Sequence, residues 1–135
     1  MLNNDNRLKQ RFDNFEKALH YLENAMNLQN PDIFQKAGMI QFFEMCSELS
    51  CKLLKDYLEE QRFIDIKSPR VALKKSFEIG LINDGHEWLE LLEDRNLTSH
   101  TYDEETVTEV EKLIREKYYP LLKDLYDTFK NIEDK

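Results

Sequence analysis

The sequence predicts an all-α protein: one antiparallel up-and-down bundle of four main helices and a short one, within a single domain of residues 1–135. A chain of 135 residues suits one domain with its own core. Three glycines and three prolines supply too few turns for a many-stranded sheet. Apolar residues also recur at helical spacing through most of the chain.

The first helix is expected over residues 5–28 and the second over residues 31–61. An apolar seam at steps of 4, 3, 4, 3 and 4 defines the first: Leu8, Phe12, Phe15, Leu19, Leu22 and Met26. Asn30 is the predicted N-cap of the second, with Pro31 in its first turn.

Apolar residues cover about two-thirds of the circumference of the second helix, more than a helix buried on one side requires. We therefore expect this helix to lie at the centre of the bundle and also to meet another chain. Glu44, Glu48, Lys52 and Lys55 share the remaining stripe. This stripe is a solvated face, or its first three residues line a polar pocket or interface.

Ser68 is the predicted N-cap of a short third helix, with Pro69 in the first turn. A capping box of Asp84 and Glu87 is expected to open the fourth helix. Residues 95–102 include poor helix formers, so a bend or helix end is expected after Leu97.

The final helix is expected over residues 103–131. Asp103 is its predicted N-cap. Pro120 falls inside the apolar pattern and predicts a kink or a break.

The net charge of −8 lies in the second part of the chain. Residues 84–135 hold 7 Lys/Arg and 15 Asp/Glu, whereas residues 1–83 hold 12 of each. This excess argues against nonspecific binding of nucleic acid, so such a role needs a locally basic site or a second subunit. Arg70, Lys74 and Lys75 form the densest basic patch, which is either a solvated face or a docking site for RNA or an acidic partner.

The sequence contains neither a signal peptide nor a membrane-length apolar run, so we expect a cytoplasmic protein. Cys46 and Cys51 are expected to be free, buried or half-buried thiols, because their spacing places them on different helix faces. His20 is expected to have a surface or packing role, and His86 to be an exposed residue at the start of a helix. We predict no metal site and no cofactor, since no glycine-rich phosphate loop or zinc-ligand spacing occurs.

Arg95 and His100 suggest one kind of chemistry. A guanidinium holds a phosphodiester and offsets charge in the transition state, while an imidazole transfers a proton near neutral pH. RNA carries its own nucleophile, the 2′-hydroxyl, so this pair could cleave RNA without a metal. The spacing alone is common in proteins and carries little weight.

The stretch from Glu87 to Tyr102, E-W-L-E-L-L-E-D-R-N-L-T-S-H-T-Y, resembles the R-x4-H-x-Y signature of the HEPN superfamily. It is most similar to the branch of nucleotidyltransferase substrate-binding proteins and HepT-like toxins. The pattern from Ile40 to Lys52 and the Ser-Pro-Arg of residues 68–70 resemble the same branch. One departure is Cys51, where that pattern has an aromatic residue, usually Trp.

This resemblance implies a homodimer in which two R-x4-H stretches meet at the interface. Arg95 and His100 would be the ribonuclease pair of a toxin, and Asn96 the polar residue that follows the arginine. The implied partner is a small nucleotidyltransferase encoded nearby, which would silence the toxin by transferring AMP to Tyr102. The alternative is a non-catalytic subunit that presents substrate to that nucleotidyltransferase.

Overall fold

The computed structural model describes residues 6–95 and 103–134, and these form helices without any strand. The elements in chain order are α1 (Asn6–Met26), α2 (Ile33–Glu60), α3 (Pro69–Glu78), α4 (Gly85–Asp94), α5 (Glu104–Leu113), the π-helical turn η2 (Ile114–Tyr118) and α6 (Tyr119–Glu133). The all-α prediction is therefore confirmed for the described residues. No described helix combines the length and apolar composition that a membrane span requires.

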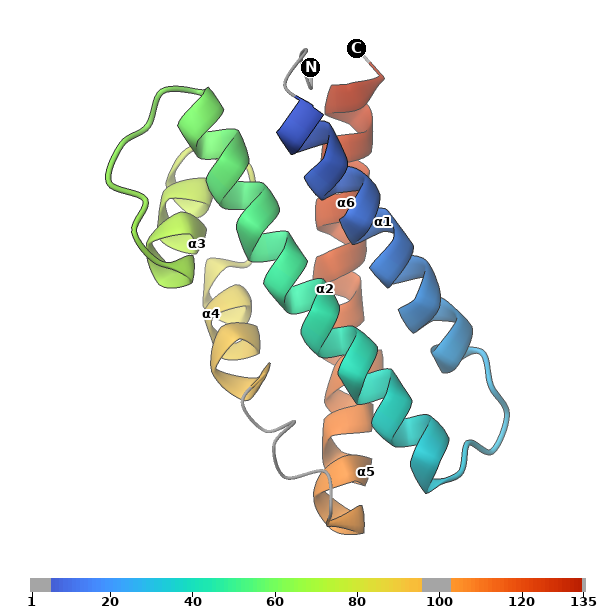
Figure 1. Ribbon diagram of the computed structural model, residues 1–135. Helices are drawn as coiled ribbons and strands as arrows, with labels where there is room; N and C mark the ends of the chain where they lie inside the picture. The colour runs from blue at the N-terminus through green and yellow to red at the C-terminus, as the bar shows by residue number, and fades with distance from the viewer. Residues whose placement is uncertain (1–5, 96–102, 135) are drawn as a thin grey trace.

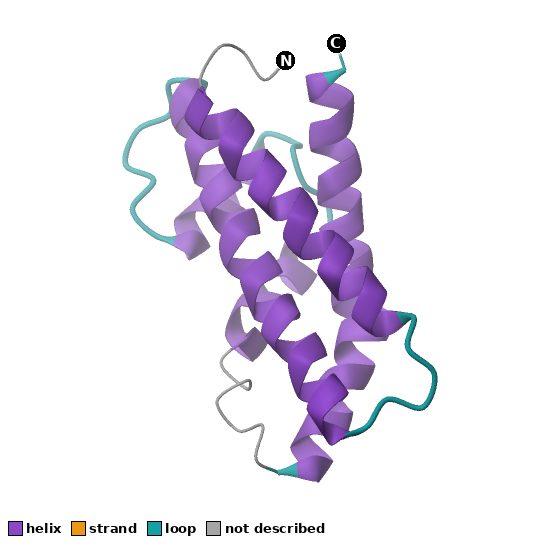
Figure 2. Cartoon of the chain, turned by 45° about the vertical axis from the view of Figure 1, so that its right-hand side comes forward, coloured by secondary structure: helices purple, strands orange, loops and turns teal. Residues whose placement is uncertain are grey.

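The helices form a bundle around α2, as Figures 1 and 2 show. Helix α1 runs antiparallel to α2, and the rod of α5, η2 and α6 runs in the same direction as α2 and ends beside the start of α1. The two ten-residue helices α3 and α4 lie together along one flank of the bundle. Because α2 contacts α1, α3, α5 and α6, its predicted central position is confirmed.

The core consists mostly of apolar side chains that recur at helical spacing. The predicted seam of α1 is buried from Leu8 to Leu22, and Met26 packs against the core at its end. A smaller cluster of Leu58, Ile66 and Ala72 lies beneath the segment that joins α2 to α3. Burial of these side chains is the main force that holds the helices together.

Hydrogen bonds between polar side chains tie the long helices to one another. Arg11 Nε on α1 donates to Asp56 Oδ2 on α2 at 2.8 Å. From α6, the Tyr126 hydroxyl donates to Glu16 at 2.5 Å, and the Tyr119 hydroxyl donates to Glu23.

Two of the predicted helix caps are confirmed. Ser68 accepts a hydrogen bond from the Val71 backbone N–H at 3.2 Å and places Pro69 in the first turn of α3. Asp103 accepts from the Glu105 N–H at 3.1 Å and begins α5.

The prediction of an Asn30 N-cap is wrong. Asp32 caps α2 through a reciprocal capping box with Gln35. Asn30 instead has a φ of 50°, a left-handed conformation that belongs to the turn between α1 and α2. An N-cap residue needs an extended backbone, which Asp32 has.

The predicted Asp84 capping box is also wrong, although α4 does begin at Gly85. Asp84 adopts a left-handed conformation (φ 45°, ψ 45°), and its side chain makes no cap hydrogen bond. Gly85 packs closely against Phe77, because a Cβ there would lie 2.9 Å from the Phe77 ring and the ring would have to shift.

Pro120 disturbs the final helix without breaking it. The five residues of η2 precede α6, and the Tyr119 N–H bonds to the carbonyl of Ile114, five residues back. Proline lacks an N–H and crowds the carbonyl four residues earlier, so a wider π turn next to it accommodates the ring. The helix then continues to Glu133.

Candidate functional site

Arg95 is the described member of the predicted site. It is the C-cap of α4 and is half-buried. Asn96, His100 and Tyr102, together with the bend predicted after Leu97, lie outside the described residues.

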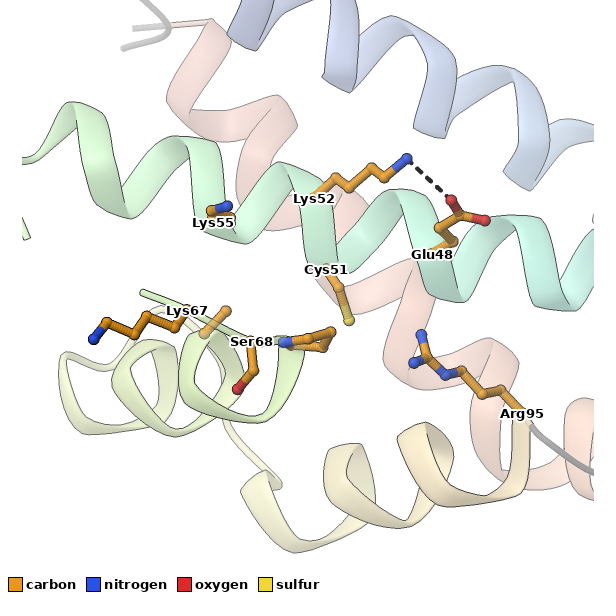
Figure 3. Close-up of a pocket in the computed structure, with 9 residues that line it drawn as sticks. Glu48, Cys51, Lys52, Lys55, Lys67, Ser68 and Arg95 are labelled. Atoms are coloured by element: carbon orange, nitrogen blue, oxygen red, sulfur yellow. Dashed lines mark ion pairs between the residues drawn. The ribbon is translucent and has the colours of Figure 1, made fainter. Parts of the chain in front are cut away.

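Arg95 lines a cavity of about 150 Å³ between α2, the start of α3 and the end of α4. The side chains around it are Glu48, Cys51, Lys52, Lys55, Lys67, Ser68, Pro69, Ala72 and Arg95. In Figure 3 the Cys51 thiol and the Arg95 guanidinium extend toward the same space from opposite helices. The site is therefore built jointly by the central helix and the α3–α4 flank.

The cavity has a strongly cationic border within an acidic protein. Three lysines and Arg95 line it with a single carboxylate, that of Glu48. Glu48 pairs with Lys52, four residues later on the same helix, at 3.0 Å. Lys67 turns outward in Figure 3, so its ammonium points away from the space that the Arg95 guanidinium and the Cys51 thiol face.

The polar stripe of α2 is a solvated face, and part of it also lines the cavity. Glu44, Glu48, Lys52 and Lys55 are all exposed, as a solvated face would be. Glu48 and Lys52 also line the cavity, whereas Glu44 does not. The sequence analysis missed Lys55 and Lys67 as site residues; the position of Lys67, one residue before the Ser68 cap, was the available signal.

Cys51 forms part of the cavity wall and is not an activated nucleophile. Burial raises the pKa of its thiol, and the nearby Arg95 charge opposes this rise only in part. Burial also raises the pKa of Cys46, to about 12. Both thiols are free and buried, as predicted.

Tyr118 on η2 holds the end of α4 next to Arg95. Its hydroxyl donates a hydrogen bond to Asp94, the residue before Arg95, and its ring stacks on Phe43 with centroids 5.5 Å apart. Burial, followed by this contact with Asp94, raises the pKa of Tyr118. Nothing in the sequence pattern singled out Tyr118 as a residue that holds this site.

The basic patch of α3 is separate from the cavity lining. Arg70 pairs with Glu93 at 3.5 Å, and Lys75 pairs with Glu78 at 3.4 Å and lies over the Phe63 ring. Lys74 is exposed. A docking role for Arg70, Lys74 and Lys75 remains a prediction.

His20 and His86 lie at the surface, as predicted, within 3.4 and 3.3 Å of Glu23 and Glu90. Within residues 6–95 and 103–134, no cluster of three or more His, Cys, Asp or Glu side chains could hold a metal ion.

The fold and the site together define a small all-α bundle that presents a motif arginine to a cation-lined cavity. Residues 10–131 match the model of the family described as nucleotidyltransferase substrate binding protein like. The chain belongs to this family, and its predicted place in the HepT-like branch of the HEPN superfamily is confirmed.

Known proteins that resemble the chain include the following two. A probable ribonuclease HepT from Haemophilus influenzae is 38% identical over 73 residues, which cover 51% of this chain and 50% of that relative. The match therefore spans half the length of the relative. A protein of known crystal structure from Thermus thermophilus is 30% identical and has a TM-score of 0.75, over 82% of this chain and 94% of that one.

Proposed function

We propose that this protein is a metal-independent endoribonuclease, the cytoplasmic toxin of a toxin–antitoxin pair. The observation that carries the proposal is the Arg95 guanidinium, which extends into a cavity lined by three lysines. The similarity to a probable ribonuclease HepT supports it.

In the proposed reaction, Arg95 binds the scissile phosphodiester and His100 transfers protons. The 2′-oxygen forms a bond to phosphorus as the bond from phosphorus to the 5′-oxygen breaks. The 2′-hydroxyl proton passes to a base, and a proton is delivered to the leaving 5′-oxygen, so the products are a 2′,3′-cyclic phosphate and a 5′-hydroxyl. A guanidinium fork offsets the charge that develops on the phosphoryl oxygens.

We propose that the active form is a homodimer in which two copies of Arg95, Asn96 and His100 share one cleft. Two exposed apolar side chains on α2 support a contact between chains: the Phe34 side chain is 83% exposed and Met45 is 42% exposed. Light scattering coupled to size-exclusion chromatography measures the mass directly. A monomer at micromolar concentration would contradict the shared cleft.

The test of catalysis is cleavage of a fluorescent single-stranded RNA in the presence of EDTA. We expect wild-type protein to cleave it, and His100→Ala to lose about 100-fold or more of the rate, in the range of general acid–base catalysis. His86→Ala is the matched control, because it removes an exposed histidine of α4 and should leave the rate unchanged. Equal rates for His100→Ala and wild type would refute the nuclease.

We further propose that a nucleotidyltransferase encoded nearby regulates the toxin at Tyr102. The Tyr102 oxygen would attack the α-phosphorus of ATP, form an O–P bond and release pyrophosphate, while its proton passes to solvent. The added negative charge and bulk would block the RNA site two residues from His100. Mass spectrometry after coexpression should find one AMP on wild type and none on Tyr102→Phe, with Tyr21→Phe as the control that keeps it.

A second candidate function is favoured by the description of the family, which names a nucleotidyltransferase substrate-binding protein. In that case the chain would present substrate to its partner without cleaving RNA. Stable complex formation with the nucleotidyltransferase, together with no RNA cleavage by the wild-type dimer, would support this function over the first.

A further inference from the structure

We propose that the cavity beside Arg95 binds a phosphodiester group of the RNA strand next to the one that is cleaved. Lys52, Lys55 and Lys67 would be the binding residues that it contributes. This inference rests on the proposed ribonuclease function and deepens it, because it assigns substrate-binding residues outside the R-x4-H motif.

Local charge favours a phosphate at this cavity. The chain carries a net charge of −8, which repels a polyanion at long range. At the cavity the balance is reversed, with four cationic side chains and one carboxylate. A phosphate that reaches the cavity therefore meets a locally cationic lining.

The size of the cavity suits a single phosphate group. The cavity volume of about 150 Å³ is well below the roughly 300–1,000 Å³ of pockets that enclose whole small molecules. It has room for several waters or for one phosphate group of a longer strand that lies across the mouth. A helix or a folded peptide loop would not enter it.

The groups are arranged so that two neighbouring phosphates could be held side by side. Arg95 points inward and, in the proposed reaction, holds the scissile phosphate with its planar fork. The lysines of the lining are exposed and have flexible stems, so they can turn toward the next phosphate of the strand once it is bound. The Glu48–Lys52 pair is exposed, and exposed ion pairs contribute little stability, so a phosphate can replace Glu48 as the partner of Lys52.

The uncharged part of the lining also favours an anion. Cys51, Pro69 and Ala72 contribute small, mostly apolar surfaces to it. These surfaces provide no competing charge and lower the local dielectric, which strengthens contacts between a phosphate and the cationic side chains.

The test measures binding without cleavage. A fluorescein-labelled 12-nucleotide single-stranded RNA of mixed sequence is titrated with the His100→Ala protein, and its anisotropy is followed at several salt concentrations. In that background we expect Lys55→Gln with Lys67→Gln to raise Kd about tenfold or more, and to lower the slope of log K against log salt by about one for each lysine.

The matched control is Lys9→Gln, which removes an exposed lysine of α1 that pairs with Asp13. Its Kd and salt slope should stay within about twofold of the background. Lys74→Gln tests the α3 patch in the same way. If the cavity double variant binds as tightly as Lys9→Gln, or if Lys74→Gln alone produces the whole loss, the proposal is wrong.

A cavity-filling variant separates shape from charge. Cys51→Phe adds a ring at the cavity wall and leaves every charge in place. We expect weaker RNA binding by a protein whose helical circular dichroism is unchanged. Unaltered affinity in a folded Cys51→Phe protein would overturn the proposal, and the lysine variants decide the question if this one does not fold.

Two further outcomes separate the inference from the proposed function. Lysine-dependent RNA binding by a wild-type protein that never cleaves RNA would refute the nuclease and leave the phosphate site standing. Cleavage with unchanged KM in the lysine double variant would refute the phosphate site alone. An acidic 12-residue glutamate peptide that binds more tightly than the RNA, through the same lysines, would identify a protein-docking site and also overturn the inference.

Discussion

The two flanks of α2 differ in what holds them together. On one side, α1 and α6 bury long apolar seams against α2 and add hydrogen bonds such as Arg11–Asp56 and Tyr126–Glu16. On the other side, α3 and α4 have ten residues each and leave a charged cavity between themselves and α2. The first flank supplies most of the stability, and the second carries the candidate site.

This difference implies that stability and function should respond to different substitutions. A side chain in the α1–α2–α6 packing should affect unfolding first and activity only through unfolding. A side chain at the cavity should affect RNA binding or cleavage with little change in stability. Substitutions on either side of this division, and one at its boundary, test it.

The largest effect is expected for Phe15→Ala. Phe15 is fully buried in the α1 seam, and its removal leaves a cavity as well as losing apolar burial. We expect the free energy of unfolding to fall by about 3–5 kcal/mol in urea denaturation. Asn14→Ala, at the exposed neighbouring position, should change it by less than about 0.5 kcal/mol. A loss below about 1 kcal/mol for Phe15→Ala would contradict a close-packed core.

Tyr118→Phe should affect both stability and function, because Tyr118 packs in the core and its hydroxyl holds Asp94 beside Arg95. We expect the free energy of unfolding, measured by urea denaturation, to fall by about 1.5–3 kcal/mol, the range for a hydrogen bond to a charged group. We also expect RNA cleavage to fall at temperatures where the variant remains folded, since the end of α4 is less well held. Full activity in the folded variant would show that Arg95 does not depend on this contact.

Tyr126→Phe should lower the free energy of unfolding by a smaller amount, and this loss should depend on pH. The hydrogen bond to Glu16, followed by burial, raises the pKa of Tyr126 from 10.0 to about 12. The unfolded chain therefore loses the phenol proton at a lower pH than the folded chain does. The stabilising contribution of Tyr126 is present below about pH 10 and is lost between about pH 10 and 12.

Urea denaturation across this range provides the measurement. Tyr126→Phe should be less stable than wild type by about 1 kcal/mol at pH 8, and the two should converge as the pH approaches 12. Glu16→Gln, which removes the acceptor charge, should reduce the same difference. A gap between wild type and Tyr126→Phe that widens above pH 10 would reverse the sign and refute the assignment.

Much of the fold could be predicted from the sequence because burial imposes a helical period. The seam from Leu8 to Leu22, the central place of α2 and the Ser68 and Asp103 caps all follow from local pattern. The errors at Asn30 and Asp84 share one physical cause. Both residue types favour N-caps and also tolerate the left-handed backbone, and the choice depends on the path of the turn, which the sequence pattern does not reveal.

The candidate site was only partly predictable, because it joins residues that are distant in the chain. The motif identified Arg95, and the stripe of α2 suggested Glu48 and Lys52. Lys55 and Lys67 also line the cavity, and that depends on how α3 packs against α2. The cavity also depends on the small side chain of Cys51, since the aromatic residue expected at that position would fill this space. The Tyr118–Asp94 contact depends on the π turn of η2.

Arg95→Ala should have the smallest effect on stability and a large effect on function. Arg95 is a half-buried C-cap at the end of a short helix, so we expect the free energy of unfolding to change by less than about 1 kcal/mol. RNA cleavage should fall by about 100-fold or more, as expected when a preorganised charge that stabilises the transition state is removed.

Arg115→Ala is the contrasting variant, because Arg115 donates to the Met26 carbonyl at 2.9 Å and to Glu111, joins η2 to α1, and lies outside the cavity lining. It should lower stability more than Arg95→Ala and leave the cleavage rate of the folded protein unchanged. If Arg95→Ala instead unfolds the bundle while Arg115→Ala abolishes cleavage, the separation of scaffold from site is the wrong description of this molecule.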